Sequence, residues 1–208
     1  MTGNNAVANY LKYSGNKFID LKAALIDMDG VLYDSMKNHT RAWVKLMTKN
    51  GIKCTRDEFY LYEGMRGVEI VKMKFKSGKG VNVTDSEAEA YYKVKSRYFH
   101  ELGEPSTIPG AAAMLNAFKD ASIERILVTG SGQQSLLDRI DTDYPDIFSD
   151  KRVTAADTRF GKPNPAPYIK GMEKAEAKPN QCIVVENAPL GVQAGHAAGC
   201  FTVGITTG

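Results

Sequence analysis

Two carboxylates stand two residues apart, at Asp27 and Asp29, directly after the apolar run 23–26 and before Gly30. The run is too short for a helix and is typical of a buried strand that ends in a turn. Because residues i and i+2 of a strand project to the same side, both carboxylates can face one site. Their repulsion requires a nearby cation or one protonated group, an arrangement suited to a nucleophile beside a general acid/base. Taken alone, a strand followed by an Asp-Gly turn is also a common structural feature.

Two further segments carry groups that suit phosphate. A Thr-Gly-Ser-Gly loop begins at Thr129, between a predicted strand and a predicted helix, so Gly130 and Ser131 lie at a helix N-terminus that could cradle phosphate oxygens. The same sequence also suits a tight turn. Lys162, in a Gly-Lys-Pro-Asn-Pro segment, could place a point charge against a phosphoryl group or against Asp27. Taken alone, an exposed loop lysine is the simpler interpretation.

A fourth polar cluster, Glu186 and Asn187, directly follows the apolar run 183–185. Carboxylate and amide oxygens are ligands that suit Mg²⁺, a hard cation. Alternatively, Asn187 caps the helix that Pro189 begins. Each cluster is ambiguous by itself, but four polar clusters at predicted strand ends in one chain together favour a single site.

The elements that would position these clusters alternate between helix and strand after residue 105. Helices are predicted at 111–120, 133–140, 165–174 and 192–198, and strands at 126–128, 153–154, 183–185 and 201–203. This alternation predicts an α/β fold with a doubly wound, parallel, Rossmann-like sheet. Ligands of such sheets bind beyond the carboxyl ends of the strands, which is where the four clusters lie.

The segment between the first strand and residue 105 has a different pattern. Helical spacing is found at 39–50, 68–75 and 86–102. We therefore predict an inserted helical cap over residues 35–105, hereafter the cap. The α/β core then comprises residues 19–34 and 106–208, and residues 1–18 form a polar lead-in.

Composition excludes several classes of function. The chain has 208 residues, 43% hydrophobic content and a formal charge of +3, which is too small to indicate nucleic acid or a membrane surface as a partner. No apolar run approaches the span of a bilayer. The three cysteines are widely spaced and lack metal-ligand spacing, so they are expected to be reduced thiols in a cytoplasmic protein. We expect a monomer that acts on a small phosphorylated substrate.

With the motifs in this order, the chain resembles the haloacid dehalogenase superfamily of phosphotransferases, in its β-phosphoglucomutase-like subgroup. The resemblance rests on Asp-Met-Asp-Gly-Val-Leu from Asp27, Thr-Gly-Ser from Thr129, Lys-Pro-Asn-Pro from Lys162 and Glu-Asn-Ala-Pro-Leu-Gly from Glu186. It covers nearly everything from about residue 20 onward. The chain stops at Gly208, where similar proteins continue through another strand and helix, so a truncated C-terminus is one interpretation.

The resemblance implies a role for each matched residue. Asp27 would be the nucleophile that becomes an aspartyl phosphate, and Asp29 would protonate the leaving group and then activate water. Thr129, with Gly130 and Ser131, would hold the phosphoryl oxygens. Lys162 would neutralise charge. The cofactor would be Mg²⁺, held by Asp27, the backbone carbonyl of Asp29 and a group from the fourth motif, Glu186 or Asn187.

Two departures from the pattern bear on the substrate. Asn187 stands where many relatives have an aspartate, which removes one negative charge from the metal site. In the cap, Glu63 stands where sugar-phosphate mutases have a basic substrate-binding residue. A cap glutamate that reaches the metal would restore the charge and occupy the space of a hexose, as in the inorganic pyrophosphatase branch of the subgroup, which this chain resembles. Alternatively, Glu63 pairs on the cap surface, for example with Arg66, which is itself a candidate substrate-binding residue.

We therefore predict an Mg²⁺-dependent phosphohydrolase whose substrate is inorganic pyrophosphate. The alternative functions are a sugar-phosphate phosphatase, a β-phosphoglucomutase, and, more remotely, a non-catalytic protein that binds phosphorylated metabolites.

Overall fold

Five parallel strands form one sheet in the order β3-β2-β1-β4-β5 in the computed structural model, which describes residues 3–148 and 151–207. The strands are β1 (Ala23–Ile26), β2 (Glu124–Val128), β3 (Arg152–Val153), β4 (Cys182–Glu186) and β5 (Phe201–Gly204). β1 lies between β2 and β4, with Ile26 opposite Leu127 on one side and Val185 on the other. The predicted doubly wound parallel α/β sheet is confirmed.

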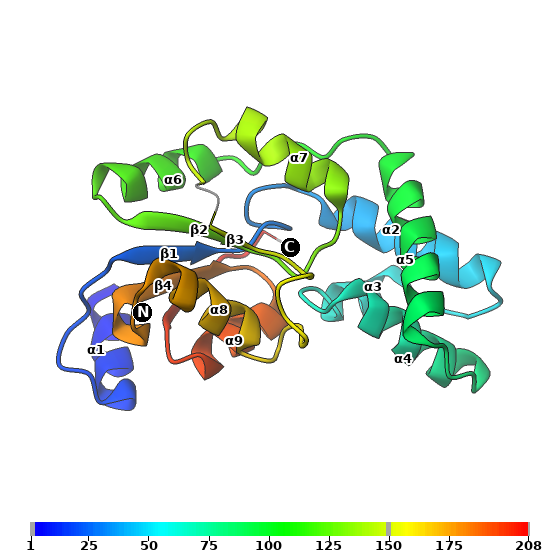
Figure 1. The fold of residues 1–208 in the computed structure, drawn as a ribbon, viewed down its shortest axis with the longest axis horizontal. Helices are drawn as coiled ribbons and strands as arrows, with labels where there is room; N and C mark the ends of the chain where they lie inside the picture. The colour runs from blue at the N-terminus through cyan, green and yellow to red at the C-terminus, as the bar shows by residue number, and fades with distance from the viewer. Residues whose placement is uncertain (1–2, 149–150, 208) are drawn as a thin grey trace.

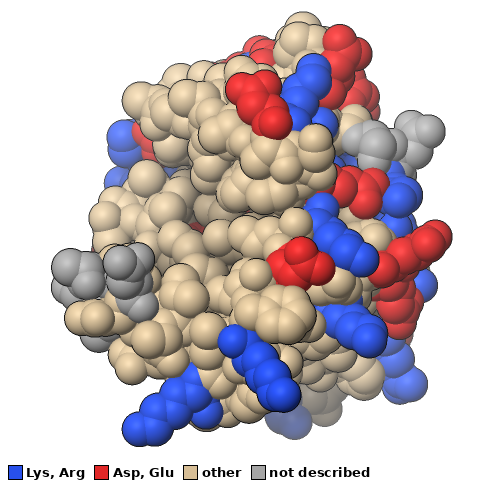
Figure 2. Space-filling view, turned by 90° about the vertical axis from the view of Figure 1, so that its left-hand side faces the viewer, with Lys and Arg blue, Asp and Glu red and all other residues tan. Residues whose placement is uncertain are grey.

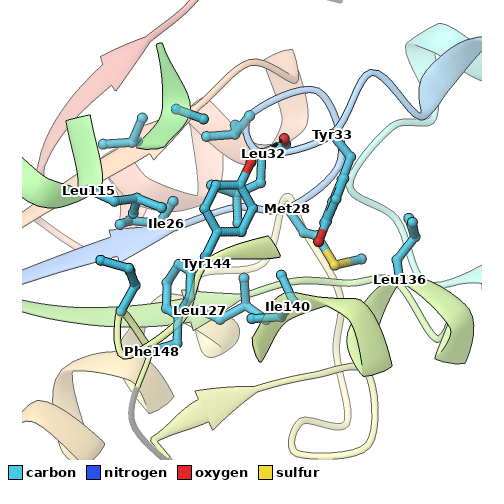
Figure 3. Close-up of a cluster of buried hydrophobic side chains, with 14 of the residues drawn as sticks. Ile26, Met28, Leu32, Tyr33, Leu115, Leu127, Leu136, Ile140, Tyr144 and Phe148 are labelled. Atoms are coloured by element: carbon cyan, nitrogen blue, oxygen red, sulfur yellow. Dashed lines mark hydrogen bonds between the residues drawn. The ribbon is translucent and has the colours of Figure 1, made fainter. Parts of the chain in front are cut away.

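Helices cover both faces of the sheet (Figure 1). One face carries α6 (Ala111–Asp120) and α7 (Gln134–Asp143), and the other carries α8 (Ala166–Ala175) and α9 (Pro189–Ala197). Alternation along β1 explains the two layers, because Ala24 and Ile26 pack toward α6 and α7 whereas Ala23 and Leu25 pack toward α8 and α9. Figure 3 shows the first of these cores, where side chains of β1, β2, α6 and α7 interdigitate.

A second helical group lies at one end of the sheet (Figure 1). It comprises α2 (Met36–Lys49), α3 (Arg56–Leu61), α4 (Gly67–Lys79) and α5 (Asp85–His100). These helices have their own apolar cluster, which includes Trp43, Phe59 and Val71. The chain enters and leaves the group along paired segments, where the Asp34 amide donates to the Ser106 carbonyl at 2.9 Å. The predicted cap boundaries fall at this paired connection, and they stay a prediction.

Local sequence explains where the cap helices begin. Thr84 caps α5, as its sequence predicts, and it forms a reciprocal capping box with Glu87. Thr55 does the same with Glu58 for α3, a helix that the apolar periodicity did not predict because it is only 6 residues long. Ser35 is the residue before α2, but its side chain makes no capping hydrogen bond. Ser35 has the residue type of a helix cap, but its hydroxyl donates to Asp29 instead.

Two further helices complete the described structure, α1 (Gly3–Ser14) and the 3₁₀ helix η1 (Pro179–Gln181). α1 falls within the stretch expected to be a polar lead-in, and it is fixed by the Tyr10 hydroxyl, which donates to the Gly199 carbonyl at 2.9 Å. None of the described helices combines the length and apolar character needed to cross a bilayer. On the face in Figure 2, basic and acidic side chains are interspersed over a mainly uncharged surface.

Candidate active site

The carboxyl ends of β1, β2 and β4 meet the underside of the cap, and the predicted motifs converge there. Asp27 follows β1 and is 5% exposed; its amide donates to the Val185 carbonyl of β4, which continues the strand pairing by one residue. Lys162, 1% exposed, donates from Nζ to Asp27 Oδ1 at 2.6 Å. The structure therefore excludes the exposed-loop interpretation of Lys162.

Lys162 is shared between two carboxylates. Its ammonium also donates to Glu186 Oε1 at 2.5 Å and to the Val128 carbonyl at 3.3 Å. Burial lowers the pKa of Lys162, but the charges of Asp27 and Glu186 outweigh it and raise that pKa above its usual range. The ammonium therefore stays charged. Burial also raises the pKa of Asp27, and Lys162 opposes this shift, so the ionised nucleophile depends on the lysine.

Glu186 is completely buried and surrounded by donors. Besides Lys162, Oε1 accepts from the Tyr168 hydroxyl at 2.8 Å, and Oε2 accepts from the backbone amides of Asn187 at 2.9 Å and Ala188 at 3.0 Å. Four donors fill the acceptor sites of a carboxylate. Glu186 was predicted as a metal ligand, and it would have to give up one of these donors to take a cation.

Asp29, the second carboxylate of the motif, faces the cap. Its Oδ1 accepts from the Ser35 hydroxyl at 2.5 Å, and His39 Nε2 lies 2.9 Å from the same oxygen. Burial raises the pKa of Asp29, but interactions with His39, Ser35 and Lys95 outweigh it and hold that pKa at about 2. Asp29 is therefore ionised at neutral pH in this state of the site.

A buried lysine stands behind His39. Lys95 of α5 is 1% exposed, and its Nζ contacts His39 Nδ1. When Lys95 is protonated, its ammonium can only donate, so Nδ1 is then the acceptor and the proton of the neutral ring lies on Nε2, facing Asp29. Burial lowers the pKa of Lys95 to about 7, and burial together with Lys95 lowers that of His39.

Sequence patterns did not reveal His39 or Lys95. The two residues are separated by 56 positions, and the three histidines of the chain have no spacing that indicates a metal or catalytic site. One signal was present in α5. Lys95 falls on the same helical stripe as the buried Ala88 and Phe99, and a lysine on an apolar stripe indicates a buried partner.

Glu63 approaches the core from the loop between α3 and α4. It is 8% exposed, and its Oε1 accepts from Asn187 Nδ2 at 2.7 Å. The alternative in which Glu63 pairs with Arg66 on the cap surface is therefore wrong. Burial raises the pKa of Glu63 to about 8. Asn187 does not cap α9, whose N-cap residue is Ala188.

The oxygen ligands expected for Mg²⁺ are partly assembled. Asn187 Oδ1 is buried with no hydrogen-bond partner among the described residues. Gly30 makes room for this amide, because a Cβ at Gly30 would lie 2.0 Å from Asn187 Nδ2. Asp27, Asp29 and Glu63 line one pocket between the core and the cap, and Glu63 also lines the neighbouring pocket that contains Asn187. An unpartnered amide oxygen beside buried carboxylates suits a hard cation, so these residues fit Mg²⁺. Within residues 3–148 and 151–207, no three His, Cys, Asp or Glu side chains already form a metal cluster.

The loop predicted to bind phosphate, residues 129–132, joins β2 to the segment before α7 and contacts the cap. Thr129 is 2% exposed and its Oγ1 accepts from the Ser131 amide at 3.0 Å. Gly130 lies against the cap, because a Cβ there would come within 2.6 Å of the Gly64 carbonyl oxygen. The Gly132 amide donates to the Tyr92 hydroxyl of α5 at 3.0 Å. Thr129, Gly130 and Ser131 all line the pocket with Asp27 and Asp29.

Arg66 is not brought to this pocket. Its Nη1 donates to the Arg159 carbonyl at 2.7 Å, and it lines a neighbouring cavity on the other side of Tyr92. On the cap side, the pocket that contains Asp27 and Asp29 is lined largely by apolar or aromatic side chains. These are Met36, Trp43, Phe59, Tyr62, Met65, Ile70 and Tyr92.

Comparison with known proteins agrees with this arrangement. Residues 21–199 match the family model described as haloacid dehalogenase-like hydrolase. The chain belongs to this family. The β-phosphoglucomutase-like subgroup and a phosphatase-type hydrolase, both predicted from the motifs, are confirmed.

Individual relatives place this haloacid dehalogenase-like hydrolase among phosphatases and mutases. It is 29% identical to hexitol phosphatase A of Escherichia coli over 88% of this chain and 82% of that protein. It is 25% identical to β-phosphoglucomutase of Bacillus subtilis, over 90% of this chain and 84% of that protein. A provisionally named β-phosphoglucomutase structure from Bacteroides vulgatus is 43% identical, with a TM-score of 0.93, over 98% of this chain and 83% of that chain.

Proposed function

We propose that this chain is an Mg²⁺-dependent phosphohydrolase that acts through a phosphorylated Asp27 and that its substrate is inorganic pyrophosphate. The observation that carries the substrate is the approach of Glu63 to Asn187 at 2.7 Å. A glutamate held there supplies the negative charge that Asn187 lacks. Once Mg²⁺ binds and neutralises this charge, the glutamate repels the anionic substrate less. It also takes up space beside the nucleophile.

Asp27 performs the first chemical step. Lys162 holds Oδ1 at 2.6 Å, and the other carboxylate oxygen attacks phosphorus. The bond from phosphorus to the leaving oxygen breaks as the bond to Asp27 forms. Thr129 and the amides of its loop hold the phosphoryl oxygens while Lys162 balances their charge, and such charge stabilisation supplies most of the acceleration in phosphoryl transfer.

Asp29 acts in the second half of the reaction with pyrophosphate. With its pKa at about 2 it is ionised, and it takes a proton from the water that attacks phosphorus while the bond between phosphorus and Asp27 breaks and frees the Asp27 carboxylate. In the first half, a proton is needed most when the leaving group is a sugar alkoxide, which is strongly basic. Phosphate is a far weaker base than an alkoxide, so pyrophosphate depends less on this proton than a sugar phosphate does.

Asp27, the backbone carbonyl of Asp29, Asn187 and Glu63 would hold the Mg²⁺. When bound, the cation neutralises charge on the phosphoryl group and orients it.

The buried, free thiols of Cys182 and Cys200 support a reducing, cytoplasmic location.

A sugar-phosphate phosphatase or β-phosphoglucomutase is the second candidate. The names of the relatives favour it, and the apolar and aromatic roof of the pocket would suit the carbon skeleton of a sugar.

Acid-quench trapping tests the covalent mechanism proposed for pyrophosphate. Brief incubation with ³²P-labelled pyrophosphate and Mg²⁺, followed by acid, is expected to leave label on Asp27, and a chelator is expected to abolish it. Turnover without a labelled protein would contradict the covalent mechanism.

A further inference from the structure

One buried side chain next to the catalytic lysine has no assigned role. Tyr168 lies in the first turn of α8, is 0% exposed, and packs with the apolar residues between the sheet and α8 and α9. Its hydroxyl donates to Glu186 Oε1 at 2.8 Å. Its ring lies beneath Lys162, with Nζ 5.0 Å from the ring centroid. Tyr168 therefore contacts both partners of the buried ion pair.

The buried ion pair joins one positive charge to two negative charges, and the Tyr168 hydroxyl donates to one of the two carboxylates. Lys162 Nζ is 2.6 Å from Asp27 and 2.5 Å from Glu186, so one cation faces two carboxylates in a site where water is largely excluded. The carboxylate with fewer other donors attracts the ammonium more strongly. Glu186 Oε2 has two backbone amides, whereas Oε1 has only Lys162 and Tyr168.

We propose that Tyr168 is a positioning residue, whose hydroxyl satisfies Glu186 so that Lys162 remains available to Asp27 and to the phosphoryl group. Without it, Glu186 Oε1 has the ammonium as its one remaining donor among those described, and Lys162 shifts toward Glu186. The Gly191 backbone packs closely against the Glu186 carboxylate, because a Cβ at Gly191 would lie 1.8 Å from Oε1. No side chain at position 191 is therefore available to supply Glu186 with another donor.

This inference rests on the proposed roles of Asp27 and Lys162. It predicts a defect in the chemical step and not in substrate binding, because Tyr168 is buried behind Lys162 and does not line the pocket. Phosphorylation of Asp27 should slow, whereas KM should stay nearly constant.

The test is Tyr168→Phe, which keeps the ring beneath Lys162 and removes only the hydroxyl. The matched control is Tyr144→Phe. Tyr144 is also buried, and its hydroxyl donates to the Leu32 carbonyl at 2.7 Å, a carbonyl that keeps a second donor in the Ile108 amide. Each variant loses one buried hydrogen bond, so the two should have comparable melting temperatures. A difference between their rates then reports an effect on catalysis and not on stability.

The measurements are kcat and KM for the substrate that the wild type hydrolyses best, with the single-turnover rate of Asp27 phosphorylation by rapid quench. We expect Tyr168→Phe to reduce kcat and the phosphorylation rate about tenfold with KM changed less than about twofold, and Tyr144→Phe to match the wild type. Equal rates for Tyr168→Phe and the wild type, or a change in KM alone, would overturn the inference. A wild type that turns over without any phosphorylated Asp27 would instead contradict the proposed function, and kcat would still decide the role of Tyr168.

Discussion

Glu63 and Asn187, which are 124 positions apart in the chain, share a hydrogen bond of 2.7 Å that joins the cap to the end of β4. The bond brings a buried carboxylate to the place where the sequence lacks a second acidic residue of the fourth motif. It also leaves Asn187 Oδ1 without a partner among the described residues. The loop that carries Glu63 therefore closes the site on the side where the cation is expected.

Removal of the Glu63 carboxylate should weaken the response to Mg²⁺. We expect Glu63→Ala to lower kcat/KM for pyrophosphate about ten- to a hundredfold and to raise the Mg²⁺ concentration needed for half-activation, because an oxygen ligand is lost. Initial rates over a range of Mg²⁺ measure both. Glu173→Ala, which removes an exposed glutamate of α8, is the control. Mg²⁺ activation curves identical to the wild type would return Glu63 to a purely structural role.

The buried Glu63 should also make stability depend on pH when Mg²⁺ is withheld by a chelator. Burial raises the pKa of Glu63 from 4.5 to about 8, so between these values the folded protein holds a proton that the unfolded chain has released. Unfolding free energy therefore falls as pH rises through this window, by at most a few kcal/mol. Urea unfolding at pH 5 and pH 7 measures the slope. Glu63→Gln should flatten it, and an unchanged slope would show that Glu63 is ionised in the folded state.

Asp27→Asn should eliminate turnover while it preserves the fold. An amide cannot act as the nucleophile, so phosphate release should fall by about a thousandfold or more. The variant should still melt cooperatively, since the amide fits the space of the carboxylate. Appreciable hydrolysis by this variant would exclude a covalent intermediate on Asp27.

His39 should lower the pKa of Asp29. In the wild type, His39, with Ser35 and Lys95, holds the pKa of Asp29 at about 2 against the opposing effect of burial. His39→Ala leaves burial less opposed, so the pKa of Asp29 rises and the acidic limb of the kcat–pH profile moves to higher pH. His100→Ala, at the exposed end of α5, is the control. Superimposable acidic limbs for His39→Ala and the wild type would contradict this role.

The sheet and the four motifs could be predicted because their signals are local. An apolar run before Asp27 and helix-strand alternation after residue 105 define the elements, and the carboxyl ends of parallel strands necessarily meet. The helix at Ala111–Asp120 has the predicted bounds, whereas α1 was missed because its sequence is polar and one tyrosine, Tyr10, anchors it to the core.

The interactions that tune the site could not be predicted, because they join residues distant in sequence. Ser35 has the residue type and position of a helix cap, yet a nearby buried carboxylate competes more strongly for its hydroxyl, and it binds Asp29. Arg66 has the charge expected of a phosphate ligand, but the backbone turns it toward the Arg159 carbonyl. Lys95 and Tyr168 act through His39 and Glu186, and no spacing rule connects such partners.

The central claim is that the site hydrolyses pyrophosphate, and direct comparison of substrates tests it. Phosphate release would be measured with Mg²⁺ for pyrophosphate, glucose 1-phosphate, glucose 6-phosphate and acetyl phosphate, in the wild type and in Glu63→Gln. We predict kcat/KM for pyrophosphate at least about tenfold above that for either hexose phosphate in the wild type, with this preference reduced in the variant. A higher kcat/KM for a hexose phosphate, or its conversion to an isomer without phosphate release, would contradict the claim and identify a sugar-phosphate phosphatase or a mutase.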